Sequence, residues 1–168
     1  MRRRICMCLL IFLCFLLQST LFKTFSIGDI SPNLLLILTV SFALMRGKRE
    51  GMFVGFAGGL LSDLMFGSTV GLTSLLYVII GYLCGYCYRI FYDDDIKMPV
   101  LLIALSDIGY GIGEYGLRFL LRGRIDFFYY FGRIIIPEMI YTVVITLVTY
   151  RLLLLLNRKL ERAEQRSV

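Results

Sequence analysis

Residues 134–156 read IIIPEMIYTVVITLVTYRLLLLL, an apolar run in which Glu138 and Arg151 are the charged side chains. A helix of about 20 predominantly apolar residues crosses the roughly 30 Å hydrocarbon core of a bilayer. This stretch is therefore predicted to be a transmembrane helix. The chain that contains it is expected to fold in lipid, where apolar side chains face outward as well as inward.

Five more apolar segments accompany this run and decide the fold class. They cover residues 5–22, 32–45, 51–66, 71–91 and 98–121. The chain is 58% hydrophobic and has a mean hydropathy of +0.79, an excess that one soluble core could not bury. We predict an all-α polytopic membrane protein with about six transmembrane helices, in a single integral membrane domain over residues 1–168. The second and third segments are short, so they are expected to be partly re-entrant or to lie in thinned bilayer.

Lysine and arginine side chains predict the orientation of these helices. With the N-terminus inside, the cytoplasmic side carries most of the positive charge: Arg2, Arg3, Arg4, Arg46, Lys48, Arg49, Arg89, Lys97, Arg151, Arg158, Lys159, Arg162 and Arg166. The opposite side carries Lys23, Arg118, Arg122, Arg124 and Arg133. We therefore predict a multi-pass protein of the bacterial cytoplasmic (inner) membrane with both termini in the cytoplasm. Residues 2–17 resemble a signal peptide, but no small-x-small cleavage site follows, so a retained first helix is expected.

The composition argues against nucleic-acid binding and against catalysis. The net charge of +6 is divided among short clusters between apolar segments, which is typical of membrane orientation and not of a nucleic-acid surface. No histidine occurs, so the serines and the five cysteines lack a base partner for nucleophilic catalysis. The chain is predicted not to be an enzyme, and no cofactor and no metal site are expected.

Two short motifs are interpreted as coincidences of helix composition. Cys84 and Cys87 form a CxxC, but they lack the soluble strand-to-helix setting of thioredoxin-type chemistry and are expected to be buried thiols. Gly111, Gly113 and Gly116 match GxGxxG, whereas a dinucleotide site needs a preceding strand and a βαβ unit.

Several charged side chains are predicted to lie at membrane depth, where an unpaired charge is costly: Asp63, Asp107, Glu114, Arg118 and Glu138. Asp107, Gly111, Glu114 and Arg118 share one helical face by their spacing, and Glu114 and Arg118 have the spacing of an intrahelical ion pair. The favoured interpretation is an internal polar ladder that fixes helix packing. A contact surface for a partner's membrane helix and a proton or solute path are the alternatives.

Glycines predict where helices approach each other closely, because small residues drive helix contact in lipid. Gly51, Gly55 and Gly59 form two overlapping GxxxG repeats, and Gly81 and Gly85 form another. Packing within the chain is favoured over dimerisation. Gly111 is expected to be a packing position on the charged helix face.

Residues 122–133 (RGRIDFFYYFGR) combine arginines with consecutive aromatic side chains. This combination suits the headgroup region on the outer side of the membrane. A docking surface for the extracytoplasmic part of a partner is the alternative, and the two interpretations are compatible.

The run GGLLSDLMFGSTVG at residues 58–71 resembles the GLLxDxxxG…G signature of the MreD family of rod shape-determining membrane proteins. Further stretches resemble the family in order along nearly the whole chain: LQST at 17–20, PNLLL at 32–36, RGKREG at 46–51, RIFY at 89–92, RGRIDFFYY at 122–130 and IIPEMIYT at 135–142. One departure is Asn33, where many relatives carry aspartate. Each motif is weak alone, and together they are fairly specific.

The resemblance implies a fold, a set of partners and a motif role. The fold would be similar to the membrane substrate-binding components of energy-coupling-factor transporters. The partners would be those of the bacterial elongasome: MreC, the glycosyltransferase RodA, a penicillin-binding transpeptidase and MreB filaments. Asp63 with Gly59, Gly67 and Gly71 would form the family's core motif, for which a structural, helix-packing role is expected.

The function expected on this basis is that of a non-catalytic membrane scaffold of the cell-wall elongation complex. It would bind the membrane helix of MreC, contact membrane lipid, and help couple peptidoglycan synthesis to cell shape. The alternative is a small-molecule or lipid-binding protein of the transporter substrate-component type, suggested by the fold analogy and by the charged helix face. Fold analogy alone is an associational argument.

Overall fold

The structure, a computed structural model, describes residues 2–22, 32–66, 71–89, 97–120 and 127–165. These segments are almost entirely helical and contain no β-strand, which confirms the all-α prediction. The elements in chain order are α1 (Arg2–Leu17), a π-helical turn η1 (Gln18–Phe22), α2 (Leu34–Arg46), α3 (Lys48–Phe66), α4 (Leu72–Tyr86), a 3₁₀ turn η2 (Cys87–Arg89), α5 (Lys97–Leu120), α6 (Phe127–Tyr130), a π-helical turn η3 (Phe131–Ile135) and α7 (Ile136–Gln165).

Each predicted apolar segment contains or overlaps one long helix, and the ends differ where charged residues continue a helix. Helix α7 runs on to Gln165, past the predicted end at residue 156, because Lys, Arg, Glu and Ala are good helix formers. Only Gly47 separates α2 from α3, and its φ of +90° explains why glycine occupies this one-residue turn. Its N–H donates to the carbonyl oxygen of Ala43 and so closes the last turn of α2.

Two helical stretches are long and apolar enough to cross a membrane, Lys97–Leu117 and Phe131–Arg158, with mean hydropathies of 1.3 and 2.1. Three shorter apolar helices accompany them: Ile5–Thr20, Leu34–Arg46 and Leu72–Tyr86. The 13 residues of α2 give a length of about 20 Å at about 1.5 Å per residue, less than the thickness of a hydrocarbon core. The count of six complete crossings stays a prediction.

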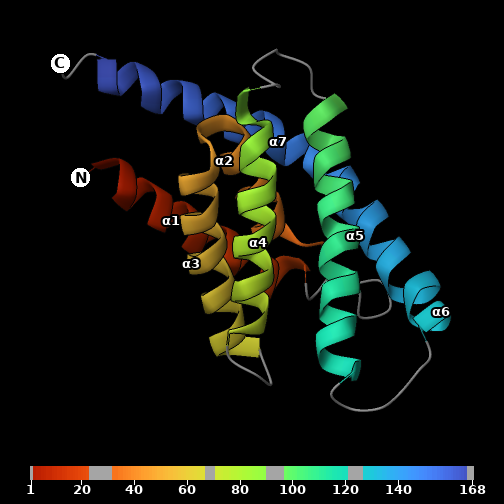
Figure 1. Cartoon of the computed structure of the whole chain (residues 1–168). Coiled ribbons are helices and arrows are strands. Elements are labelled where there is room, and N and C mark those ends of the chain that lie inside the picture. Colours follow the sequence, from red (N-terminus) through yellow and green to blue (C-terminus); the bar gives the residue numbers. More distant parts are fainter. Residues whose placement is uncertain (1, 23–31, 67–70, 90–96, 121–126, 166–168) are drawn as a thin grey trace.

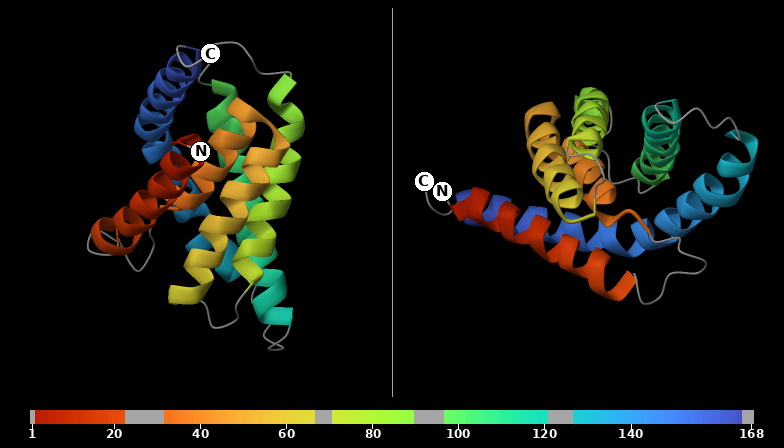
Figure 2. Two further views of the ribbon diagram at one scale, coloured as in Figure 1. Left: turned by 90° about the vertical axis from the view of Figure 1, so that its left-hand side faces the viewer. Right: turned by 90° about the horizontal axis from the view of Figure 1, so that it is seen from below.

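Helix α2 lies at the centre of the molecule (Figures 1 and 2). Helices α3, α4 and α5 pack on one side of it, whereas α1 and α7 lie together on the other (Figure 2). Every residue from 34 to 44 is buried. Its sequence, LLLILTVSFALMR, is apolar around the whole circumference, which is the pattern of a helix enclosed on all sides.

The surrounding helices bury one face and expose large apolar side chains on the other. Such side chains include Leu9 on α1, Leu64 on α3, Leu83 on α4, Leu105 on α5 and Val148 on α7. So many exposed apolar side chains around one small protein would be an aggregation hazard in water. In a bilayer the same side chains match the lipid chains, so the exposure pattern agrees with a membrane protein.

We expect Leu36→Ala to destabilise the fold and Leu83→Ala to leave it nearly unchanged. Leu36 is 0% exposed at the centre, so truncation creates a cavity that should cost about 2–5 kcal/mol. Leu83 is 59% exposed, and its change should stay within about 0.5 kcal/mol. Unfolding free energies from titration of the purified protein with a denaturing detergent measure both. Equal losses at the two positions would contradict the central position of α2.

Candidate functional site: the buried polar contacts between helices

Asp63, near the end of α3, caps the beginning of α4. Its Oδ2 accepts hydrogen bonds from the backbone N–H groups of Gly71 at 2.9 Å and Ser74 at 3.1 Å, and its Oδ1 accepts one from Thr73 N at 3.3 Å. The first N–H groups of a helix have no partner within the helix, and a carboxylate there also interacts favourably with the helix dipole. Asp63 is therefore a helix cap supplied by the preceding helix.

Gly71 has a different role from the close packing expected of it. Among the described residues no atom lies within 4 Å of the position that a Cβ would take, so Gly71 makes no close helix contact with them. Its backbone has φ +103° and ψ −15°, a left-handed conformation that glycine adopts without strain. Asp63 binds the N–H of Gly71 itself and the N–H groups of Thr73 and Ser74 that follow it. Gly67, the other glycine of the predicted motif, lies outside the described residues.

The glycines of α3 and α4 face one another along a single seam. A Cβ on Gly55 would lie 2.6 Å from the carbonyl oxygen of Tyr77, and one on Gly81 would lie 2.6 Å from that of Gly51. Gly59 meets the backbone of Ser74, and Gly85 meets the backbone of Lys48. The seam is internal to the chain and contacts main chain directly. Any side chain larger than hydrogen would therefore have to push two helices apart.

Asn33 joins three helices at the start of α2. Its Oδ1 accepts hydrogen bonds from Leu36 N, at 3.3 Å, and from the hydroxyl of Tyr77 on α4. Its backbone N–H donates to Oγ1 of Thr142 on α7 at 3.3 Å. Oε1 of Gln18, the first residue of η1, accepts a further hydrogen bond from Leu35 N at 3.2 Å. The buried N-terminus of α2 therefore finds acceptors within the protein in place of water.

The charged face predicted on α5 turns toward α7 and α4. Asp107 is buried, and among the described residues neither of its carboxylate oxygens has a partner at hydrogen-bond geometry, although the hydroxyl of Thr142 on α7 interacts with it. A Cβ added to Gly111 would lie 2.9 Å from the side chain of Ile135. Glu138, on the first turn of α7, is near enough to Asp107 and Glu114 for electrostatic interaction. The side chain of Arg118 lies outside the description, so its predicted pair with Glu114 stays a prediction.

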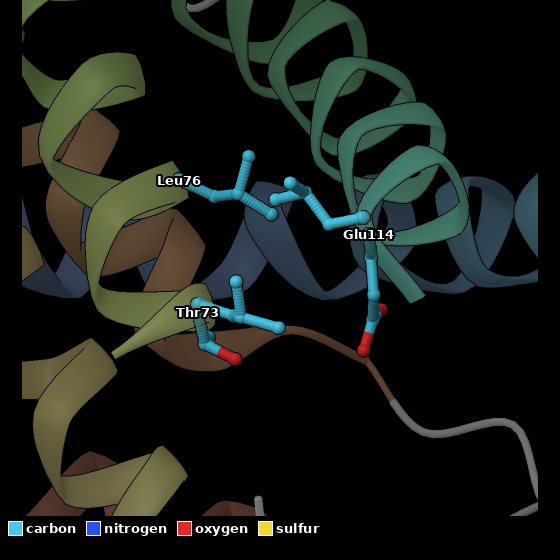
Figure 3. A pocket seen from close by; sticks show the side chains of 5 residues that line it. Thr73, Leu76 and Glu114 are labelled. Carbon is cyan, nitrogen blue, oxygen red and sulfur yellow. The ribbon is translucent and has the colours of Figure 1, made fainter. Parts of the chain in front are cut away.

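Glu114 borders a narrow cleft between α4 and α5 (Figure 3). The other lining residues are Leu72, Thr73, Leu76 and Leu117. Figure 3 shows Leu76 and Thr73 reaching toward α5 and Glu114 descending beside them. The space between these side chains does not hold a water molecule. This cleft is therefore a packing contact between two helices.

Two further contacts join distant parts of the chain and were not found from the sequence. Arg46 Nε, at the end of α2, donates to Oδ1 of Asn157 on α7 at 2.5 Å. The Lys48 Nζ lies over the rings of Tyr82 and Tyr86, 5.7 Å and 5.2 Å from their centroids, within the range of a cation–π contact. The sequence contains a signal for the cation–π contact, because Lys48 belongs to the basic cluster between α2 and α3. It contains no signal for the contact between Arg46 and Asn157, which lie 111 positions apart.

The remaining candidates lie apart from these contacts. All five cysteines are free, and Cys84 Sγ lies 3.3 Å from Ser106 Oγ between α4 and α5. No group of three potential metal-ligating side chains occurs among the described residues. In the aromatic stretch, Phe128 and Tyr129 are exposed, and the guanidinium of Arg133 lies 5.5 Å from the ring centroid of Tyr129. Arginine with exposed aromatic rings agrees with the predicted interfacial position.

The fold and these contacts define a class of protein: a helical membrane protein whose buried polar side chains hold its own helices together. The sequence comparison identifies the family. The family model described as rod shape-determining protein MreD matches residues 1–160, and the chain belongs to the MreD family. Membership implies a role in rod shape determination, in a family of shape-determining structural proteins that is not a known enzyme family. No solved structure matches the chain.

We expect Asp63→Ala to destabilise the protein by about 1–3 kcal/mol, because buried N–H groups at the start of α4 lose their acceptor. Asp63→Asn keeps one acceptor oxygen and should cost less. Ser62→Ala, at the neighbouring half-buried position, is the matched control. Detergent-denaturation midpoints of the purified variants measure the order. A loss for Ser62→Ala as large as that for Asp63→Ala would argue against the capping role.

Gly55→Ala and Gly109→Ala form a second matched pair. At Gly55 the added methyl group meets the main chain of α4, whereas no described residue lies within 4 Å of the Cβ position at Gly109. Overpacking of this kind costs about 1–3 kcal/mol, so Gly55→Ala should lower stability by that amount. Gly109→Ala should be neutral or stabilising, since alanine favours a helix. Thermal unfolding in detergent compares the two variants, and equal midpoints would disprove the tight seam.

Proposed function

We propose that this chain is a non-catalytic adaptor of the cell-wall elongation complex, and that it binds the membrane helix of MreC. In this role it helps couple peptidoglycan synthesis to cell shape. The observation that carries the proposal is the match of the MreD family model across residues 1–160, which covers every helix up to the last turns of α7. RodA, a penicillin-binding transpeptidase and MreB are the further proposed members of the complex.

The buried polar side chains contact the chain's own helices, and this supports an adaptor role. Asp63, Asn33 and Gln18 bind helix N-termini, and Arg46 binds α7. These contacts make the helices a rigid platform. The outward faces are apolar and ridged, and association between membrane helices depends on close packing of such faces more than on hydrophobicity. A partner helix would therefore be recognised by shape on an outer face.

The placement of charge supports a multi-pass protein of the cytoplasmic (inner) membrane with both termini in the cytoplasm. Arg46 and Lys48 lie at the turn between α2 and α3, and Arg46 contacts the C-terminal half of α7. Positive charge gathered near the turn and the C-terminal helix is the pattern of a cytoplasmic side.

The test is co-purification in mild detergent after co-expression with MreC. We expect a tagged copy of this chain to retain MreC, and to lose an MreC whose membrane helix has been replaced by an unrelated apolar helix of equal length. The replacement is the matched control, because it keeps the soluble part of MreC and its membrane anchoring. If this chain is folded and retains neither protein, or retains both equally, helix recognition is ruled out.

Cysteine crosslinking would then locate the contact face. Exposed apolar positions offer one probe on each of several outer faces: Leu9 on α1, Leu83 on α4, Leu105 on α5 and Val148 on α7. Each is changed to cysteine in a background without the native cysteines and oxidised with a cysteine scan of the MreC helix. A specific contact should give disulfides at one face with helical periodicity.

A further inference from the structure

The described residues include two aspartates that are similarly buried and differ in their hydrogen-bond donors. Asp63 is 2% exposed and Asp107 is 3% exposed. Three backbone N–H groups donate to the carboxylate of Asp63. Among the described residues neither oxygen of Asp107 has a partner at hydrogen-bond geometry, and the donor that interacts with it is the neutral hydroxyl of Thr142. The same side chain at nearly the same burial is therefore held in two environments that differ in the number of hydrogen-bond donors.

An ionised carboxylate with few donors is costly for a protein to bury. Removing a charge from water costs several kcal/mol even in real proteins, and only pairing or hydrogen bonding offsets this cost. A neutral carboxylic acid avoids most of the cost, because it carries no net charge and one of its oxygens becomes a donor. For Asp63 the three donors already compensate the charge.

Among the described residues, the groups that face Asp107 bring no positive charge to it. From α4 and α7, Tyr77 and Glu138 interact with it electrostatically, and both are neutral or negative. On α5 itself, Tyr110 packs against Tyr77, with 5.3 Å between ring centroids, and Glu114 interacts with Glu138. The Tyr77 hydroxyl already donates to Asn33. The Thr142 hydroxyl oxygen accepts from Asn33 N, which leaves its O–H as a neutral donor toward Asp107. Like charges so close together further disfavour a second ionised carboxylate.

We propose that Asp107 is a proton-binding site inside the helix bundle, and that it carries its proton when the folded protein is at neutral pH. The occupant is a proton because it satisfies the carboxylate without added volume. A bound metal ion would need several ligands, and no suitable group of three occurs among the described residues. This site does not depend on the proposed binding of MreC.

Infrared spectroscopy of the full-length protein in detergent tests this directly. The carbonyl stretch of a protonated carboxylic acid is distinct from the bands of a carboxylate, and carboxyl ¹³C labelling of aspartate separates aspartates from glutamates. At pH 7 we expect a label-sensitive band of a protonated aspartate in the wild type. The band should vanish in Asp107→Asn and persist in Ser62→Ala. Absence of the band from the wild type overturns the proposal without the use of any variant.

Two variants of Asp107 test whether the infrared band belongs to this residue and whether the substituted proteins still fold. Asp107→Glu keeps the acid but removes it from the aspartate label, so the labelled band should disappear from a protein that still folds. Asp107→Asn resembles the neutral acid in shape, so its unfolding equilibrium constant at pH 7 should stay within about twofold of the wild type. Asp63→Asn loses an acceptor of buried N–H groups and should raise that constant more than about fivefold.

Two outcomes would contradict the site. Persistence of the labelled band in Asp107→Glu would assign the proton to another aspartate. Stabilisation of the wild type, but not of Asp107→Asn, by sodium chloride relative to choline chloride at constant pH would assign the site to a sodium ion. Either result overturns proton binding at Asp107, and neither bears on retention of MreC.

Discussion

The first N–H groups of a helix have no partner within that helix, and water cannot reach them when the helix begins inside a membrane protein. The fold therefore depends on which residues supply the hydrogen-bond acceptors for these groups. Two helices are in this position. At α2 the acceptors are the side chains of Asn33 and Gln18, and at α4 the acceptor is Asp63 of the preceding helix. Each acceptor except Asn33 comes from a neighbouring helix. The same contact therefore satisfies a helix end and fixes the position of one helix against another.

The short central helix follows from this arrangement. Helix α2 is only about 20 Å long, yet it is enclosed by α1, α3, α4, α5 and α7. Its start is held by Asn33, and its end is held by Arg46 through Asn157. The α3–α4 pair is held differently, by a glycine seam along its length and by Asp63 at the loop end. The helices are therefore positioned both by polar contacts at their ends and by close main-chain contacts along their lengths.

The sequence predicts the helices well because apolar runs long enough to form them are separated by glycine, proline or charge. It also predicts the α3–α4 glycines as candidates, since GxxxG repeats require no knowledge of the partner. It does not separate Gly71 from them, because a spacing cannot distinguish a left-handed φ from a close contact. It cannot pair Asn33 with Thr142, since 109 positions separate them and each has other possible partners.

Asn33 also shows what the start of α2 requires of the residue at this position. An aspartate at this position would offer the same oxygen to Leu36 N and to the Tyr77 hydroxyl, so the cap needs an acceptor and not a charge. Placed beside Asp107 and Glu138, a further carboxylate would add negative charge to a buried region that already lacks cations among its described neighbours. The amide provides the acceptor without that charge. The buried polar centre of this protein therefore depends on oxygen atoms as acceptors, and its net charge is set by how many of its acids hold a proton.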